Sequence, residues 1–391
     1  MNTSISLPPS RLPRVGTTIF STMSQLAADT GALNLSQGFP DFDGPQALKD
    51  RVSHYLNQGH NQYAPMPGVP ALREAIAHKV QTLYGYHADP DHEVTVTSGA
   101  TEGIFAAIAA CVRPGDEVIV FDPAYDCYEP AITLNGGITH HLPLQPPHFT
   151  IDWQQLADLL HRQPRLVIVN NPHNPTGAVL TQQDLNQLAD LLAETPTLLL
   201  GDEVYEHIVF DGRPHLSLLS HPALAARSIV VSSFGKTYHT TGWKVGYVVA
   251  PQALSAEVRK VHQYLTFSTS TPFQWALADF MNQHPEHHTQ LPHFYQAKRD
   301  HFCDLLRNSH FNLTPTQGTY FQLLDYHAIS DQLDTEMALR LTREIGVAAI
   351  PISVFYAEPP RDLHYLRLCF AKSEATLSQA AERLCHLSPA G

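Results

Sequence analysis

The chain has 391 residues, of which 43% are hydrophobic, and a formal net charge of −13 at pH 7. This length is sufficient for a large core and two domains, and the acidic charge argues against nucleic acid or an anionic membrane surface as the main partner. Five cysteines without a C-x-x-C pair, and no apolar run of membrane-spanning length, predict a cytoplasmic protein with free thiols.

The N-terminal part combines a polar arm with three helical patterns. The three prolines within residues 1–13 indicate the arm. The spacing of apolar residues predicts helices at 17–28, 45–58 and 71–84. Gly38 begins a turn signal between the first two helices, where the backbone can approach a ligand closely or simply turn. Tyr63 lies in a proline-rich loop and, taken alone, has the character of a packing residue.

From residue 94 the pattern becomes an alternation of strands and helices, which predicts a mostly parallel sheet flanked by helices. The expected strands are 94–97, 117–121, 165–169, 197–200, 228–232 and 245–250. The expected helices are 104–112, 150–163, 181–193, 255–267 and 271–280.

Residues that can bind a ligand or take part in a reaction follow the ends of five of these strands. In an open α/β sheet, ligands bind outside the carboxyl ends of the strands. We therefore expect these residues to meet in one crevice: Gly99, Ala100 and Thr101 after the first strand, then Tyr125, Asn174, Asp202 and Lys236.

Three of these positions have a simple structural interpretation beside the functional one. The turn at Gly99 is either an anion cradle at a helix N-terminus or a simple cap. Asp202 follows a buried leucine run and needs a cation, unless it caps the next segment. Lys236 either forms a Schiff base with a carbonyl or is a solvated loop lysine. A P-loop is excluded, because Val230 occupies the position where that motif requires glycine.

Residues 282–391 have the pattern of a smaller α+β unit. The polar stretch 282–290 is the expected boundary, and helices are predicted at 293–307 and 374–387 with strands at 319–324, 348–350 and 366–370. Arg367 lies on the last strand between apolar neighbours. His284, His287 and His288 surround Glu286, but beside Pro285 we expect a solvated loop there and no metal site.

Five motifs together resemble the class I aminotransferases, which are pyridoxal-phosphate enzymes of fold type I, and within that family the bacterial methionine aminotransferases and the kynurenine/glutamine transaminases. The motifs are N-L-S-Q-G-F-P-D at 34–41, N-P-H-N-P-T-G at 171–177, D-E-V-Y at 202–205, S-F-G-K at 233–236 and R-L-C-F at 367–370. The resemblance implies a large domain over 44–281, a C-terminal small domain over 282–391, and an arm with part of the small domain over 1–43.

The resemblance also implies roles for individual residues. Lys236 matches the lysine that binds pyridoxal 5′-phosphate covalently, Asp202 the partner of its ring nitrogen, and Tyr205 a donor to its phenolic oxygen. The other residues placed against the cofactor are Gly99, Ala100, Thr101, Tyr125, Asn174, Ser233, Lys244 and, from the neighbouring subunit of a homodimer, Tyr63. The residues placed against the substrate are Gly38, Phe20, Tyr63, Asn174 and Arg367, the last as clamp for the α-carboxylate. Relatives often carry Trp where this chain has Phe20.

The expected activity is therefore transfer of the amino group of an L-amino acid to a 2-oxo acid by ping-pong chemistry, with methionine favoured and aromatic, glutamine or kynurenine-type donors as other candidates. A pyridoxal-phosphate C–S lyase would share the cofactor residues and is the alternative. A non-enzymatic regulator would need a DNA-binding domain, and only a short arm precedes residue 17. A nicotinamide dehydrogenase would need a G-x-G-x-x-G motif, which the sequence lacks.

Overall fold

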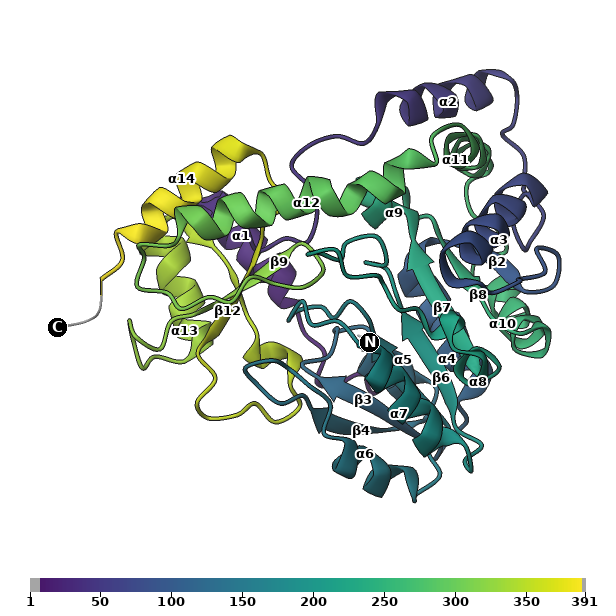
Figure 1. Ribbon diagram of the computed structural model, residues 1–391, viewed down its shortest axis with the longest axis horizontal. Coiled ribbons are helices and arrows are strands. Elements are labelled where there is room, and N and C mark those ends of the chain that lie inside the picture. The colour runs from purple at the N-terminus through teal and green to yellow at the C-terminus, as the bar shows by residue number, and fades with distance from the viewer. Residues whose placement is uncertain (1–7, 389–391) are drawn as a thin grey trace, which may run out of the picture.

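The computed structural model describes residues 8–388, so the first seven residues of the expected arm lie outside the described part of the chain. The largest element of this part is a seven-stranded sheet (Figure 1). Six strands run parallel and β8 runs antiparallel between two of them. In spatial order the strands are β2 (Val94–Thr97), β8 (Gly246–Val249), β7 (Ser228–Ser233), β6 (Leu198–Asp202), β5 (Leu166–Asn170), β3 (Glu117–Asp122) and β4 (Ile138–Pro143).

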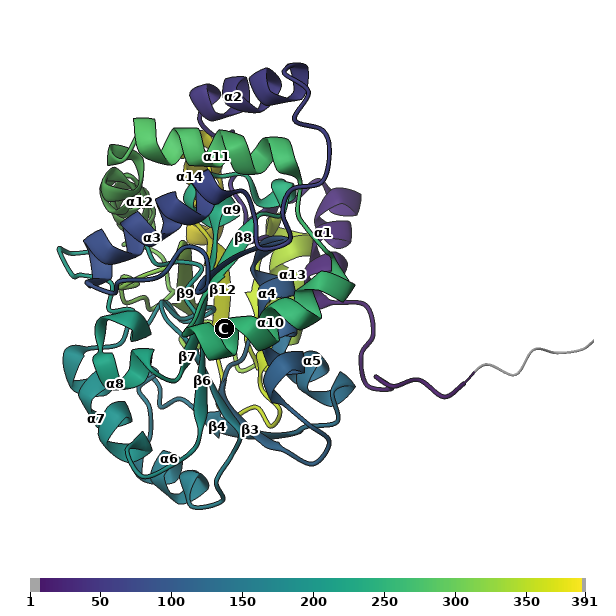
Figure 2. The ribbon, with the colours of Figure 1, turned by 90° about the vertical axis from the view of Figure 1, so that its right-hand side faces the viewer.

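Helices cover both faces of this sheet, as Figure 2 shows. Because side chains alternate across a strand, Leu166 and Ile168 of β5 join one buried apolar cluster while Val167 and Val169 join the other. The first face packs against α4 (Gly99–Cys111), α5 (Tyr128–Leu134) and α10 (Gln252–Leu265). The second packs against α3 (Pro70–Tyr84), α6 (Trp153–Leu160), α7 (Gln182–Leu192), α8 (Pro222–Ala225) and α11 (Thr271–Gln283). The predicted α/β class is thus confirmed.

The C-terminal part forms a smaller α+β unit. Its antiparallel sheet has the order β11 (Ile350–Pro351), β12 (Tyr365–Cys369) and β9 (Phe321–Asp325). The long helix α12 (Glu286–Leu305) runs from α11 to this unit, where it lies beside α14 (Glu374–Cys385) in Figure 1. The N-terminal helix α1 (Ile19–Thr30) packs here too, because β1 (Leu33–Asn34) pairs in parallel with β10 (Val347–Ala348). On this pairing we propose that residues up to 43 belong with the C-terminal unit; the domain bounds stay a prediction.

Several elements differ from the sequence expectation. The loop expected at 282–290 is wrong, because α11 extends to Gln283 and α12 begins at Glu286 with Pro285 at its N-cap, where a proline breaks no helical hydrogen bond. The sequence analysis also did not predict α5, β4 or α13 (Asp334–Arg340). Helix α2 (Gln46–Asn57) agrees with its prediction. Within the described residues, no helix is both long and apolar enough to cross a membrane.

A buried ion pair ties α3 to the sheet. Lys79 of α3 donates to both carboxylate oxygens of Glu206 at 2.7 Å, and both side chains are buried. Tyr247 of β8 donates to the same carboxylate at 2.6 Å, and Ser232 of β7 and Tyr84 also donate to it. Burial opposes ionisation, yet Lys79 and the hydroxyl of Ser232 hold the pKa of Glu206 well below its usual range. The network therefore fixes α3 and two strands around one charged carboxylate.

We expect Glu206→Ala to lower the free energy of unfolding by about 3–5 kcal/mol, because it leaves the Lys79 ammonium buried without its counter-charge. Denaturant unfolding followed by far-UV circular dichroism measures this. Glu257→Ala is the matched control, since it breaks the exposed pair with Lys260 and should leave the midpoint almost unchanged. Equal midpoints for the two variants would contradict the role assigned to Glu206.

Candidate active site

A cavity of about 300 Å³ lies at the carboxyl edge of the large sheet. The sequence analysis expected the strand ends to meet there, and the structure brings them together. Thirteen of the predicted site residues line it: Phe20, Gly38, Gly99, Ala100, Thr101, Tyr125, Asn174, Asp202, Tyr205, Ser233, Lys236, Lys244 and Arg367. The remaining predicted residue, Tyr63, lies outside the cavity and is 85% exposed.

Lys236 reaches the cavity from the short helix α9 (Phe234–Thr237), which follows β7 directly. Its amine donates to the carbonyl of Gly38 and to the hydroxyl of Tyr320, both at 3.0 Å. Burial lowers the pKa of Lys236 to about 8. A substantial fraction of this amine is therefore neutral near physiological pH, which is the state in which an amine acts as a nucleophile or a base.

Asp202 is the last residue of β6 and is 4% exposed. Burial raises its pKa to about 6, although Tyr128 donates a hydrogen bond of 2.5 Å to Oδ2 and the amide of Val204 approaches Oδ1 at 3.4 Å. Lys236 lowers the pKa further and Glu203 raises it. The carboxylate is thus held close to the cavity in a setting where it gains from a cationic partner.

Arg367 comes from β12 of the C-terminal unit and is 1% exposed. Its guanidinium donates to Asn174 Oδ1 at 2.9 Å and to the carbonyl of Ser36 at 2.8 Å, and it lies over the ring of Phe321 at 4.0 Å. Among the described residues, its Nε has no hydrogen-bond partner. A buried guanidinium with an unpaired donor at a cavity wall is suited to bind a carboxylate.

One side of the cavity is suited to an anion. Helix α4 begins there with Gly99 at φ +78°, and the first backbone amides of a helix have no acceptor within the helix. Lys244 lies against this turn: a Cβ added to Gly99 would be 3.4 Å from its Nζ. Gly246 lets β8 approach equally closely, because its added Cβ would lie 2.8 Å from the amide nitrogen of Ala100. The amides and the ammonium together form a cradle for a phosphate.

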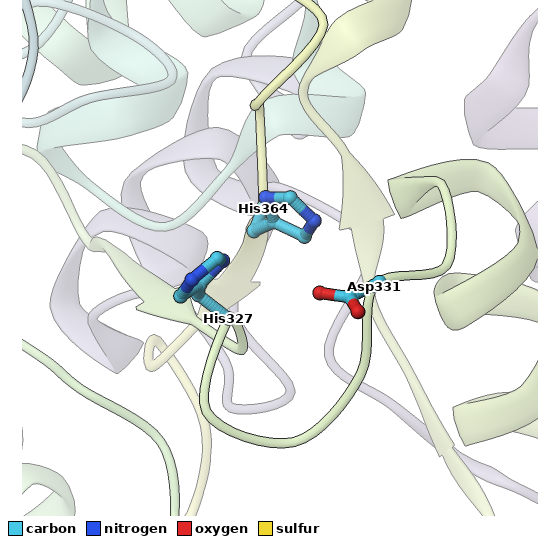
Figure 3. Close-up of side chains that lie close together, drawn as sticks. All are labelled: His327, Asp331 and His364. Atoms are coloured by element: carbon cyan, nitrogen blue, oxygen red, sulfur yellow. The ribbon is translucent and has the colours of Figure 1, made fainter.

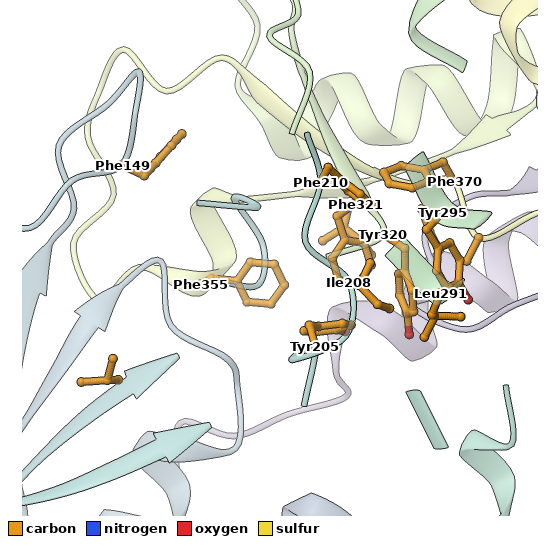
Figure 4. Packing of buried hydrophobic residues seen from close by; sticks show 14 of the residues in the cluster. Phe149, Tyr205, Ile208, Phe210, Leu291, Tyr295, Tyr320, Phe321, Phe355 and Phe370 are labelled. Atoms are coloured by element: carbon orange, nitrogen blue, oxygen red, sulfur yellow. The ribbon is translucent and has the colours of Figure 1, made fainter. Parts of the chain in front are cut away.

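The aromatic rings of Tyr205, Tyr320, Phe321 and Phe355 belong to the buried packing in Figure 4, and Tyr205 and Phe321 also line the cavity. The ring of Tyr205 meets those of Tyr320 and Phe321 edge-on, with centroids 5.1 and 5.8 Å apart. Phe20 lies beside Phe355 at 5.8 Å. These contacts fix the rings in place and give the cavity an apolar rim beside the guanidinium of Arg367.

Three residues at the site were not found by sequence reasoning. Tyr128 lies on α5, a helix that the sequence analysis did not expect, and Tyr320 precedes β9 in the distant C-terminal unit. Asn170 was seen only as a polar residue in a loop, whereas its side chain donates to the carbonyl of Asp202 and accepts from the amide of Asn174, both at 2.8 Å. Of these three residues, only Asn170, at the end of a buried strand, had a signal in the sequence.

The residues present fit pyridoxal 5′-phosphate. The α4 turn and Lys244 suit the phosphate, Lys236 offers an amine of lowered pKa, and buried Asp202 suits a protonated ring nitrogen. Arg367, whose side chain lines the same cavity, suits the carboxylate of a second ligand. This donor set is what a phosphorylated pyridine aldehyde and an amino acid require together.

The comparisons with known proteins agree with this geometry. Residues 30–384 match the family model for aminotransferase class I and II. The chain is 57% identical to a methionine aminotransferase of Escherichia coli, over 97% of this chain and 98% of that protein. A crystal structure from E. coli, identified as having a methionine aminotransferase function, superposes with a TM-score of 0.96 at 57% identity, covering 98% of this chain and 100% of that one. A kynurenine–oxoglutarate transaminase of Dictyostelium discoideum is 33% identical over 97% of this chain and 96% of that protein.

We expect Tyr128→Phe to raise the pKa of Asp202 by about one unit, because a hydrogen bond to a charged acceptor contributes about 1.5–3 kcal/mol. The folded pKa of Asp202 is already raised by burial, so loss of the donor moves its protonation closer to neutral pH. The dissociation constant for pyridoxal 5′-phosphate rises as the pH is lowered and Asp202 becomes protonated. In Tyr128→Phe this rise should therefore begin at a higher pH than in the parent protein.

The control is Tyr356→Phe, which removes a buried hydroxyl that has no hydrogen-bond partner within the described residues. An unchanged pH dependence in Tyr128→Phe, equal to that of Tyr356→Phe, would show that Tyr128 does not govern the charge of Asp202.

Proposed function

The chain is an aminotransferase of the class I and II family, and from that premise we propose that it uses pyridoxal 5′-phosphate to move the amino group of L-methionine and related amino acids to a 2-oxo acid in two half-reactions. The observation that carries this proposal is the convergence of Lys236, Asp202 and Arg367 on one cavity. An amine, a buried carboxylate and a buried guanidinium are the three groups that this chemistry needs from the protein.

When bound, the cofactor supplies an electron sink for the bond between Cα and hydrogen of the amino acid. Lys236 would hold the cofactor through its amine and, when that amine is free, would take up the α-proton as a base and return it as an acid. A pKa of about 8 suits both directions, because the amine is then neither fully protonated nor too weak a base. Gly38 and Tyr320 orient this amine at 3.0 Å.

Asp202 would favour a proton on the cofactor's ring nitrogen by being ionised, and the hydrogen bond from Tyr128 supports this charge. Asn174 and Tyr205 would donate to the ring's phenolic oxygen, and Tyr125 would pack on the ring face. The amides of Gly99, Ala100 and Thr101, together with Ser233 and Lys244, would hold the phosphate, and all of these residues line the cavity. These roles rest on the positions of the residues around the cavity and on the family to which the chain belongs.

We propose that the amino-group donor is an amino acid with an uncharged side chain, with methionine as the first candidate. Arg367 binds the α-carboxylate through the donors that Asn174 and Ser36 leave open, with Gly38 beside it. Phe20, Tyr125 and Phe321 offer an apolar rim for the side chain. Among the described residues that line the cavity, Arg367 is the only arginine, so a second clamp for a dicarboxylic donor is not supplied by the lining. Relatives named for methionine and kynurenine support this range of side chains.

We also propose a cytoplasmic homodimer in which Tyr63 reaches the phosphate bound by the partner subunit. Tyr63 is outside its own cavity, 85% exposed, and packs edge-on against Phe267 at 5.5 Å. Tyr264, Leu265 and Phe267 are exposed too, and such a group of apolar side chains is typical of an interface. The free thiols of all five cysteines support a reducing compartment.

We expect Lys236→Ala to lose transamination of methionine by at least about 10²–10⁴-fold, because the variant has no amine to carry the proton. Formation of the 2-oxo acid from methionine, with a second 2-oxo acid as acceptor, measures this. In the parent protein, methionine alone should change the absorbance of the bound cofactor and a 2-oxo acid should restore it. Lys260→Ala, at an exposed lysine, is the control. Release of ammonia and a thiol without an acceptor would instead establish a lyase.

We expect Tyr63→Phe to weaken binding of pyridoxal 5′-phosphate by about tenfold or more while leaving the dimer intact, since a hydrogen bond to a charged phosphate contributes about 1.5–3 kcal/mol. Sedimentation velocity reports the oligomer and a cofactor titration reports the affinity. Tyr264→Phe serves as control on the same exposed face. A monomeric parent protein with full cofactor affinity would refute the shared site.

A further inference from the structure

Three potential metal ligands from separate segments converge on the surface of the C-terminal unit (Figure 3). His327 lies two residues beyond β9, Asp331 lies in the loop between β9 and α13, and His364 immediately precedes β12. One donor atom from each residue lies within 4.8 Å of the other two. Figure 3 shows the carboxylate of Asp331 directed toward the two rings.

The backbone holds the two histidines beside each other. Tyr365 pairs with Asp325 at the end of the β9–β12 ladder, and the amide of Tyr326 donates to the carbonyl of His364 at 2.9 Å. The rings of His327 and His364 consequently meet with their centroids 4.9 Å apart at an angle of 76°. Their proximity follows from strand register rather than from the rotamers of two exposed side chains.

Hydrogen bonds also fix the donor atom of His364 and the loop that carries Asp331. Nδ1 of His364 lies 3.1 Å from the carbonyl of Asp362 and must donate to it, because a carbonyl only accepts. The lone pair of this ring is therefore on Nε2, as in metal-binding histidines that are oriented by a carbonyl. The hydroxyl of Tyr326 donates to the carbonyl of Gln332 at 2.8 Å, next to Asp331.

We propose that His327, Asp331 and His364 bind a divalent transition-metal ion of the zinc kind, with water completing the coordination. Two imidazoles and one carboxylate suit zinc, whereas magnesium and calcium prefer oxygen ligands alone. Ligands of one zinc ion lie about 2.0–2.2 Å from it, so their mutual distances are about 3–4 Å. The donors here lie within 4.8 Å of one another, so small rotations of these side chains bring them to that spacing.

This site is separate from the cavity and independent of the proposed reaction. Arg367 is three residues further along β12, which is about 10 Å at the rise of a strand. The ion would join the end of β9, the start of β12 and the loop before α13, so it stabilises this corner of the unit. In the sequence a metal site was weighed only at residues 284–288, and this cluster was not found; its three ligands are spread over 38 positions and show no metal-binding spacing.

Zinc titrated by calorimetry into the tag-free, cofactor-loaded protein tests the proposal. We expect His364→Gln and Asp331→Asn each to weaken one zinc-binding event by at least about tenfold. The matched control is His161→Gln, which removes an exposed histidine of the large unit and should bind zinc as the parent protein does. Zinc should also raise the midpoint of thermal unfolding in the parent and control proteins, and not in the two cluster variants.

Cobalt provides a second readout, because its visible absorption reports nitrogen and oxygen ligands directly. We expect a band in the parent protein that is lost in His364→Gln and kept in His161→Gln. Equal zinc affinity and an equal cobalt spectrum in the parent and both cluster variants would overturn the proposal. Activity toward methionine is not a readout here, so failure of this proposal is distinct from failure of the proposed function.

Discussion

The arrangement of the rest of the site depends on one carboxylate that the fold buries almost completely. Asp202 is placed at the end of β6, where burial raises its pKa to about 6. The hydroxyl of Tyr128 counters this from one side, and Asn170 fixes the backbone of the same residue from the other. The result is a charge that is ordered but incompletely compensated, and such a charge favours a cationic ring nitrogen over water.

The positive charge of Arg367 comes from another part of the chain. Arg367 is buried by the C-terminal unit, yet its hydrogen bonds reach Ser36 in the N-terminal segment and Asn174 in the large unit. Asn174 in turn donates its amide to Asn170, which contacts Asp202. Arg367 and Asp202 are therefore linked through two asparagines, and this set of contacts is complete only when the three segments have packed together. The cavity is accordingly lined by residues of all three segments.

Sequence reasoning found the parts of this arrangement that depend on local pattern. Lys236 and Asp202 follow strands whose apolar runs are unmistakable, and the rule that ligands bind at the carboxyl ends of parallel strands was enough to bring them together. Tyr128 could not be found in this way, because α5 is short and its one decisive contact is with a residue 74 positions away. The same holds for Tyr320, whose hydroxyl meets Lys236 across 84 positions. Roles that depend on tertiary contact leave no periodic signal.

The strand pair that presents Arg367 also carries the histidine cluster, and the register of that pair separates their functions. Five residue pairs join β9 and β12, and Arg367 stands opposite Leu323 in the middle of them. The position of the guanidinium is therefore set by the ladder and by its own contacts with Asn174 and Ser36, whether or not an ion binds at the far end. A metal at the cluster adds constraint where the ladder ends and the chain enters loops. The free energy of metal binding would consequently stabilise the C-terminal unit and leave the geometry of the cavity unchanged.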